Sequence, residues 1–281
     1  MKKQISEQNI KLIQAAQLTK QASRSYQQGN YSKAILQTKE ALEIRKNILG
    51  NEHIDVAVSL NHLATLYNAQ GNYSEVEILL KQAIELYKKN LGEQHPYVAT
   101  PLNNLALLYN AQGKYYQAES GFKEALAISK KNRGEEHIDV ATALNNLGLL
   151  YNYQRRYSEA ESLFKQALEL SRKLLGEENH YVAGSLNNLG TLYNEQRQFT
   201  EAEPFYQKAL VIYQKILGEK HPYLIQTCSN LATLYNNQDK YPEAETFYQQ
   251  AIELSKELLG ENHPNTKKIM QHYLSMKYRM S

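Results

Sequence analysis

Apolar residues recur at helical spacing along almost the whole chain. In one stretch Val98, Leu102, Leu105, Ala106 and Tyr109 follow each other at i, i+4, i+7, i+8 and i+11, which is one face of an α-helix. After the segment 112–115 a second stretch repeats this spacing, with Ala118, Phe122, Ala125 and Leu126 on one face. The short Gly-containing link makes the two helices antiparallel neighbours. The pattern predicts paired α-helices that bury their apolar faces against each other.

This two-helix pattern recurs with a period of 42 residues, which three markers keep in one register. The first marker is a glycine at Gly50, Gly92, Gly134, Gly176, Gly218 and Gly260. The second is a tyrosine at Tyr67, Tyr109, Tyr151, Tyr193 and Tyr235. The third is an alanine at Ala118, Ala160, Ala202 and Ala244, with Val76 in the first copy. Units that cannot bury their apolar faces alone must stack, so the sequence predicts an all-α solenoid.

The repeat also defines the expected domain organisation. We expect one solenoid over residues 1–281 with about thirteen helices, in which terminal units diverge because one of their faces meets water. Its parts are a divergent first repeat at 9–50 with helices near 9–28 and 32–48, five regular repeats at 51–260, and a capping segment at 261–281 with a last helix at 264–279.

The helix ends carry recognisable signals. Second helices are expected to begin with capping boxes, formed by Ser74 with Glu77, Ser158 with Glu161 and Thr200 with Glu203. Pro242 takes the equivalent place in a later copy, where its missing N–H costs little. The repeated glycine suits a left-handed position after the second helix. Pro204 lies inside a helix, where we expect a local distortion without a break.

Composition indicates a protein without a membrane or nucleic-acid role. The 42% hydrophobic share supports a buried core, no apolar run could span a bilayer, and the start of the chain lacks a signal-peptide h-region. The net charge of +3 is too balanced for a nucleic-acid patch. Cys228, the single cysteine, cannot form an internal disulfide, so we expect a cytoplasmic protein in which this residue is buried. The C-terminus is locally basic, and its helix is either a solvated end or a contact for an acidic partner.

Histidines recur at the repeat period but do not suggest a metal site. Equivalent positions lie roughly 20 Å apart if helix axes pack ~8–10 Å from each other, whereas zinc–nitrogen bonds are about 2 Å long. Asn179 replaces the histidine in one copy, and asparagine is a favoured N-cap, so all these residues are expected to start first helices: His53, His95, His137, His221 and His263. No phosphate-binding loop or nucleophile motif is present, so neither an enzyme nor a cofactor is expected.

The run from Asn104 to Leu126, with Asn-Leu-Ala-x-x-Tyr, Gly-x-Tyr and Ala-x-x-x-Phe-x-x-Ala-Leu, resembles the tetratricopeptide repeat (TPR) signature. The longer unit, with Leu-Asn-Asn-Leu-Ala and Leu-Gly-Glu-x-His-Pro, resembles the 42-residue type of kinesin light chains and of bacterial, notably cyanobacterial, arrays. This resemblance covers roughly residues 10–280. It implies a right-handed superhelix of about six helix pairs plus a capping helix, whose first helices line a concave groove for peptides.

Asparagines form rows on the outward side of the expected first helices. The first row is Asn61, Asn103, Asn145 and Asn187, and its mates seven residues later are Asn68, Asn110, Asn152, Asn194 and Asn236. The second row is His62, Asn104, Asn146, Asn188 and Asn230. Asparagine is a mediocre helix former, and its repeated use in the middle of helices therefore needs a reason. Either the amides grip a peptide backbone, or they brace neighbouring helices. We expect peptide contact from the first row and its mates, and leave both roles open for the second row.

The leading function is therefore a non-catalytic scaffold that binds a protein or peptide in its concave groove. Tyr97, Tyr181 and Tyr223 near the first-helix starts are candidate contacts on the rim. Two alternatives stay open: a structural module that self-assembles through its ends or faces, and a regulator whose superhelix responds to peptide. The expected oligomeric state is a monomer or weak homo-oligomer.

Overall fold

The computed structural model describes residues 2–27 and 30–280, and within these ranges every regular element is an α-helix. Thirteen helices follow one another along this described part, as predicted: α1 Lys2–Gln27, α2 Tyr31–Leu49, α3 Ile54–Gln70, α4 Val76–Leu91, α5 Pro96–Ala111, α6 Tyr115–Arg133, α7 Ile138–Tyr153, α8 Tyr157–Leu175, α9 His180–Glu195, α10 Phe199–Leu217, α11 Pro222–Asn237, α12 Tyr241–Leu259 and α13 Pro264–Met280. The first helix begins earlier than the predicted residue 9, and residue 28 lies outside the described residues.

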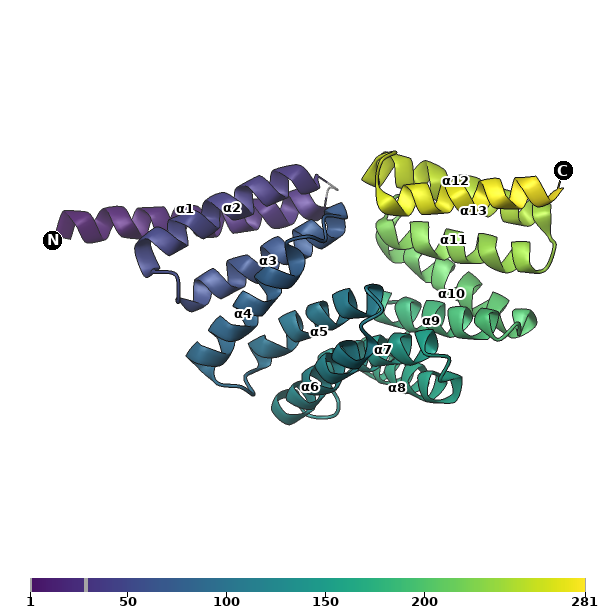
Figure 1. Ribbon diagram of the computed structural model, residues 1–281, viewed down its shortest axis with the longest axis horizontal. Coiled ribbons are helices and arrows are strands. Elements are labelled where there is room, and N and C mark those ends of the chain that lie inside the picture. The colour runs from purple at the N-terminus through teal and green to yellow at the C-terminus, as the bar shows by residue number, and fades with distance from the viewer. Residues whose placement is uncertain (1, 28–29, 281) are drawn as a thin grey trace. The chain divides into compact units, whose positions relative to one another are not determined.

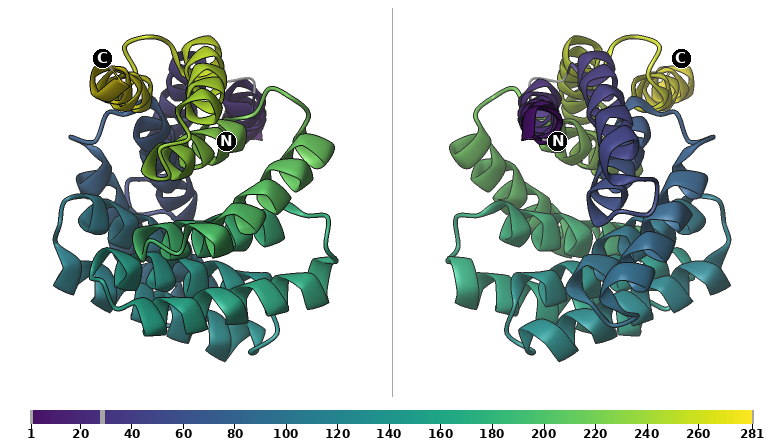
Figure 2. Two further views of the ribbon diagram at one scale, coloured as in Figure 1. Left: turned by 90° about the vertical axis from the view of Figure 1, so that its right-hand side faces the viewer. Right: turned by 90° about the vertical axis from the view of Figure 1, so that its left-hand side faces the viewer.

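The helices form two compact units, residues 1–132 (unit 1) and 133–281 (unit 2). Within each unit consecutive helices pack side by side and run antiparallel (Figures 1 and 2). In unit 2 the first helices α7, α9 and α11 also contact one another, so they form a continuous layer. This arrangement of stacked antiparallel helices is that of an all-α solenoid and confirms the predicted fold class.

Small residues on the first helices make room for aromatic rings of the second helices. An added Cβ at Gly148 would lie 2.6 Å from the ring of Phe164, and one at Gly190 would lie 2.8 Å from the ring of Tyr206. Both rings are almost completely buried. Close approach of the two backbones is therefore built into each pair by the absence of a side chain.

The repeated tyrosine and the repeated Glu-Ala-Glu join one repeat to the next. In three copies the tyrosine hydroxyl of a first helix donates to a glutamate of the preceding second helix, at 2.7–3.1 Å: Tyr109 to Glu77, Tyr193 to Glu161 and Tyr235 to Glu203. These bonds and neighbouring lysines lower the pKa of Glu77 and Glu161, with Lys81 and Lys165 as the first cause. The glutamates thus connect repeats instead of capping helices.

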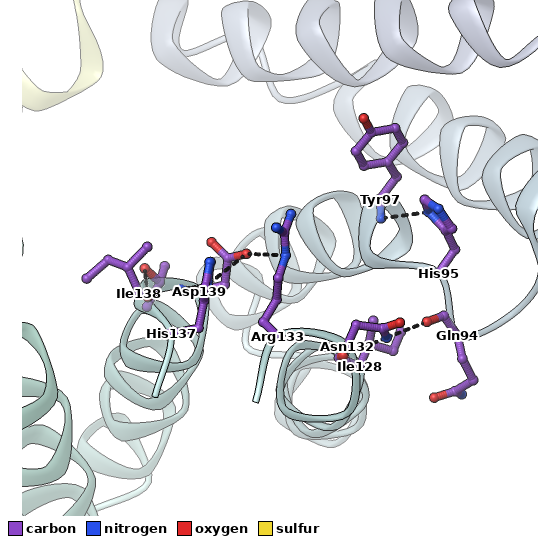
Figure 3. Close-up of polar contacts among 10 residues, drawn as sticks. Gln94, His95, Tyr97, Ile128, Asn132, Arg133, His137, Ile138 and Asp139 are labelled. Atoms are coloured by element: carbon purple, nitrogen blue, oxygen red, sulfur yellow. Dashed lines mark hydrogen bonds and ion pairs between the residues drawn. The ribbon is translucent and has the colours of Figure 1, made fainter. Parts of the chain in front are cut away.

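The histidines start the first helices, as predicted. Their Nδ1 atoms accept a hydrogen bond from the backbone N–H two residues on, at 3.1–3.3 Å, in His53, His95, His137, His221 and His263. Asn179 accepts from two backbone N–H groups in the same place. Figure 3 shows the cap of His95 on Tyr97 in unit 1, and His137 beside Asp139 in unit 2. Near the first of these, Asn132 donates to the carbonyl of Gln94 at 2.7 Å and holds the loop before α5.

The predicted capping boxes are wrong. α8 begins at Tyr157 and α10 at Phe199, so Ser158 and Thr200 already lie inside the first turn and cannot accept bonds as N-caps. Ser74 precedes α4 but donates to the side chain of Asn72. α8 and α10 follow the preceding turn directly and begin two residues too early for the serine or threonine to cap them.

The glycine after each second helix has a positive φ, but the predicted left-handed helical conformation is wrong there. Gly50, for example, has φ 85° and ψ 162°, an extended region that essentially only glycine adopts. The left-handed conformation occurs instead after a first helix, at Gly71 with φ 80° and ψ 15°. In unit 2 the non-glycine residues Arg155, Arg197 and Asp239 have a positive φ at this place. α10 runs unbroken past Pro204, and Cys228 is buried, as expected.

Candidate functional site

The first-row asparagines lie half-buried on the first helices of both units. Asn61 and Asn103 are in unit 1, Asn145 and Asn187 in unit 2, and all four side chains are neither fully buried nor fully exposed. The second-row positions are half-buried in the same way: His62, Asn104, Asn146, Asn188 and Asn230. Both rows can therefore reach a ligand on this face, and both can also reach neighbouring helices.

In unit 2 the two rows are joined into a hydrogen-bonded amide ladder. The amide of Asn188 donates to the Oδ1 of Asn145 at 3.4 Å, and the amide of Asn230 donates to the Oδ1 of Asn187 at 3.1 Å. Asn145 in turn donates to the hydroxyl of Ser185 at 2.8 Å. Asn188 and Asn230 of the second row thus each bond to the first-row amide of the preceding repeat. The bracing role occurs in both rows and is not confined to the second.

The mates seven residues later are less accessible in unit 2 than the sequence suggested. Asn152, Asn194 and Asn236 are only 2%, 8% and 6% exposed, whereas Asn68 in unit 1 is exposed and Asn110 is half-buried. The Oδ1 of Asn194 accepts a bond from Asn237 at 3.2 Å. These three amides lie in the packed interior. Seven residues turn an α-helix about 20° short of two full revolutions, so a first-row residue and its mate do not point in the same direction. Ligand contact by the mates stays a prediction.

Unit 1 departs from the ladder at its first repeat. His62 stands in the second row, and burial together with the nearby Arg45 lowers the pKa of His62. The buried Oδ1 atoms of Asn61 and Asn110 accept no hydrogen bond within the described residues. The regular amide bracing is therefore best developed in unit 2.

A pocket of ≈ 360 Å³ lies on the first-helix face of unit 2. Amides from both rows line one side, from Asn145, Asn146, Asn187 and Asn188. Gly184 on α9 forms part of the wall, where equivalent positions carry side chains: Val58, Thr100, Thr142 and Gln226. The pocket therefore exists where one repeat lacks the side chain that the other repeats have.

Aromatic residues from α9, α10 and α11 form the other side of this pocket. The rings of Tyr213 and Tyr223 lie 5.1 Å apart between centroids, and the rings of His180 and Tyr223 are nearly parallel, with centroids 6.5 Å apart. Tyr223 is 46% exposed, as expected for a rim residue, and Tyr181 is half-buried. Burial lowers the pKa of His180, so the ring is neutral near pH 7.

Tyr213 is the buried residue of this group, and its hydroxyl lies beside Gly184. The side chain is 5% exposed, and an added Cβ at Gly184 would lie 3.5 Å from its hydroxyl oxygen. The described residues give this hydroxyl no hydrogen-bond partner, and burial raises its pKa. Sequence reasoning named neither Gly184 nor Tyr213. The signal was present: glycine occurs at the register of Gly184 in one repeat only, and at the register of Tyr213 serine stands at 129, 171 and 255, with tyrosine elsewhere only at Tyr87.

Neither metal-binding nor membrane-spanning elements occur in the described part of the chain. In residues 2–27 and 30–280 no three His, Cys, Asp or Glu side chains lie close enough together to hold a metal ion. None of the helices described there combines the length and apolar character needed to cross a membrane. The pocket itself is lined by amides, hydroxyls and aromatic rings.

Comparison with known structures places the fold among kinesin-light-chain-like repeat proteins. BtubC (BKLC) from P. vanneervenii is 26% identical over 85% of this chain and 93% of its own, with a TM-score of 0.58. A kinesin-light-chain-type protein from Podospora anserina with nearly identical TPR-like repeats is 26% identical over 71% of this chain and 94% of its own, with a TM-score of 0.57. A Rap protein complexed with Competence and Sporulation Factor shares the fold, at 17% identity over 98% of this chain and 78% of its own, with a TM-score of 0.68.

Sequence comparison gives the same assignment. No curated protein sequence matches the chain. The sequence model of the tetratricopeptide repeat, however, matches residues 14–89, 97–173, 181–254 and 225–280, which is most of the chain. The protein therefore belongs to the tetratricopeptide repeat family and is of the kinesin-light-chain-like type.

Proposed function

We propose that the protein is a non-catalytic scaffold that binds an extended peptide on the first-helix face, with the first-row amides as its main contacts. Proteins of this family are in general interaction scaffolds without catalytic activity. The observation that carries the proposal is the pocket of ≈ 360 Å³ in unit 2, which lies on this face and is lined by amides of both rows. The Rap protein, solved with a bound factor, has a similar fold and is consistent with ligand binding by such a scaffold.

Bracing by the amide ladder does not exhaust the hydrogen-bonding capacity of the amides. A carboxamide has two N–H donors and an oxygen with two lone pairs. Asn187 uses its oxygen to accept from Asn230, and its own N–H groups make no hydrogen bond to the rest of the described chain. These N–H groups can donate to a peptide carbonyl. Because the ladder already fixes the amide orientation, little side-chain entropy is lost when the peptide binds.

The absence of charge on this face also favours recognition of a peptide backbone. The pocket lining contains no Asp, Glu, Lys or Arg. Backbone amides of an extended segment offer alternating donors and acceptors, which match carboxamides regardless of the peptide's side chains. In unit 1 we assign the same contact to Asn61 and Asn103.

The test is selection from a phage-displayed peptide library on the immobilised full chain. We compare the wild type with Asn103→Ala, Asn145→Ala and Asn187→Ala combined, and with Gln166→Ala plus Gln249→Ala as a control that removes exposed amides from second helices. The wild type and the control should enrich one peptide family. For the Asn variant the affinity for a synthetic member should fall at least about tenfold, since each lost hydrogen bond contributes ~1 kcal/mol.

Far-UV circular dichroism must show equal helicity for all three proteins, because Asn145 and Asn187 also belong to the ladder. Equal affinity of the Asn variant and the wild type would reject the first row as the contact surface. Failure of the wild type to enrich any peptide family would reject peptide binding itself.

A further inference from the structure

We propose that the space beside Gly184 is a subsite for one side chain of the bound peptide, and that this side chain is the carboxamide of glutamine or asparagine. The inference rests on the proposed function and adds to it a chemical preference at one place. Three properties of the subsite carry the argument: its space, its unpaired hydroxyl and its lack of charge.

The space exists because α9 has no side chain at residue 184. An added Cβ there would meet one atom within 4 Å, the Tyr213 hydroxyl oxygen at 3.5 Å, which is an ordinary contact. Gly148 and Gly190, by contrast, are filled by the rings of Phe164 and Tyr206. Gly184 therefore does not serve helix packing. Glycine in a helix interior costs about 0.5–1 kcal/mol relative to alanine, so an unfilled glycine here calls for another role.

The Tyr213 hydroxyl is the polar group that the ligand must satisfy. Other buried tyrosines of unit 2 have partners: the hydroxyl of Tyr206 donates to Thr191 at 3.0 Å, and that of Tyr248 lies 3.4 Å from the hydroxyl of Thr233. Tyr213 is also buried, at 5% exposure against 1% for Tyr206 and Tyr248, but its hydroxyl has no such partner among the described residues. Covering this hydroxyl with an apolar side chain would leave it unpaired, which costs ~1–3 kcal/mol. The ligand therefore carries a hydrogen-bonding group.

Charged ligand groups do not fit the subsite. No lining residue carries a carboxylate, ammonium or guanidinium group, and the His180 ring is neutral near pH 7. A charge taken into this pocket would lose water without gaining a partner of opposite sign, which is unfavourable by several kcal/mol. Aspartate, glutamate, lysine and arginine are therefore excluded.

Among uncharged polar side chains, the carboxamide matches the walls best. It is planar, so it can lie against the flat faces of Tyr223 and His180, whose rings are nearly parallel at 16°. It also both donates and accepts, so it can pair with the Tyr213 hydroxyl and with the lining amides of Asn145 and Asn188. Serine and threonine hydroxyls are close to the peptide backbone and have no planar group to stack.

The experiment repeats the library selection on the full chain with wild type, Gly184→Val and Tyr213→Phe. Valine is the residue of the equivalent position 58, so Gly184→Val gives unit 2 a side chain that this fold already contains. Thr100→Gly, which removes the equivalent side chain in unit 1, is the matched control. We expect glutamine or asparagine at one fixed position of the peptides that wild type and Thr100→Gly enrich, and no preference there with Gly184→Val.

The enriched peptide is then synthesised in three nearly isosteric forms, with Gln, Glu or Met at that position, and titrated by fluorescence anisotropy. For the wild type, the Glu and Met forms should bind at least about tenfold more weakly than the Gln form, because one brings an unpaired charge and the other leaves the hydroxyl unpaired. With Tyr213→Phe, the preference for Gln over Met should fall to less than about threefold, since the hydroxyl is gone.

Each other outcome rejects the inference in a recognisable way. An aromatic, aliphatic or charged residue at the fixed position, or an unchanged preference with Gly184→Val, would overturn the carboxamide subsite while peptide binding through the first row stands. If the wild type enriches no peptide, the proposed function fails and the subsite fails with it. Gly184→Val must retain wild-type helicity; if it does not, Tyr213→Phe alone decides through the ratio of Gln to Met affinities.

Discussion

Each unit contains one buried tyrosine near the end of a second helix, packed against an exposed tyrosine at the start of the next first helix. In unit 1 the pair is Tyr87 and Tyr97, with ring centroids 5.9 Å apart, and in unit 2 it is Tyr213 and Tyr223, at 5.1 Å. Tyr87 and Tyr213 are both 5% exposed, whereas Tyr97 and Tyr223 are 52% and 46% exposed. We call each of these two tyrosine pairs the corner of its unit. The two corners have the same register in the repeat.

The corners differ in what the preceding first helix places beside them. Unit 1 has Ile54, Asp55 and Val58 at positions where unit 2 has His180, Tyr181 and Gly184. The corner of unit 2 lines a pocket of uncharged groups, whereas the carboxylate of Asp55 contributes to the environment of Tyr87. The comparison shows how repeats vary function: packing residues stay in register, and a few positions in the first turns of the first helix set the surface chemistry.

Removing the buried ring should have the largest effect, and it should be equal in both corners. We expect Tyr87→Ala and Tyr213→Ala each to lower the free energy of unfolding by about 3 kcal/mol, because each leaves a cavity of aromatic size. Urea denaturation followed by far-UV circular dichroism measures this. Tyr116→Ala is the control: this ring is 86% exposed, and its loss should change stability by less than about 0.5 kcal/mol. A corner whose value matches the control would not be a packing unit.

Alanine substitutions at Gly184 and Gly190 of α9 should change the free energy of unfolding in opposite directions. Gly190→Ala places a Cβ 2.8 Å from the ring of Tyr206 and should destabilise the protein by about 1–2 kcal/mol through overpacking. Gly184→Ala makes an ordinary contact and should stabilise it by about 0.5–1 kcal/mol, the usual gain of alanine in a helix. Urea denaturation of the two single variants and of the wild type measures the difference in the free energy of unfolding.

This pair of variants decides whether Gly184 leaves space for a ligand or is required for helix packing. Destabilisation by Gly184→Ala would mean that the glycine is needed for the fold, and the contrast between the two corners would then lose its basis. Stabilisation together with weaker peptide binding would identify a position where function opposes stability.

Much of the fold could be predicted because one period governs many residues at once. A glycine, a tyrosine and an alanine in one register define the paired helices, and the histidine N-caps follow from Asn179, which takes the same place in one repeat. Helix starts were harder: Ser158 has the sequence of an N-cap, yet Tyr157 already belongs to α8. A shift of two residues, from Ser158 to the observed N-cap Arg156, depends on how the preceding turn places the chain, which local propensity does not contain.

The site was only partly predictable for a related reason. Repeated residues such as Asn145 and Asn187 attract notice, and the structure places both at the pocket. Gly184 is a single exception that the period hides, and the tyrosine of Tyr213 recurs at its register only in Tyr87. The mates of the first row were placed on the ligand face by their spacing of seven, but small differences in helix rotation bury Asn152 to 2% exposure. Such rotations come from packing between helices.

Loss of a single hydroxyl should separate paired from unpaired tyrosines in unit 2. Tyr206→Phe removes a hydrogen bond to Thr191 and should cost about 1 kcal/mol. Tyr213→Phe removes a hydroxyl without a partner and should leave the free energy of unfolding unchanged within about 0.5 kcal/mol, or raise it slightly. Both changes keep the ring, so packing is matched. A cost for Tyr213→Phe equal to that of Tyr206→Phe would show that the hydroxyl is satisfied without ligand.

The smallest expected effect tests the charge difference between the corners. The pKa of Tyr87 is raised from 10.0 to about 12, first by burial, then by Tyr97 and Asp55. A raised pKa means that the neutral form is favoured in the folded state, so its stabilising contribution is complete below pH 10.0 and is lost as the pH rises towards about 12. Asp55→Asn removes one cause and should lower the Tyr87 pKa slightly, while the pKa of Tyr213, whose causes are burial and Tyr223, should not move. An NMR titration of the tyrosine ring carbons of the full chain, with Tyr87→Phe to assign the signal, measures both. Equal pKa shifts of Tyr87 and Tyr213 would mean that Asp55 acts on the whole protein and not on its own corner. The difference in charge between the corners would then be too small to determine which ligand each corner accepts.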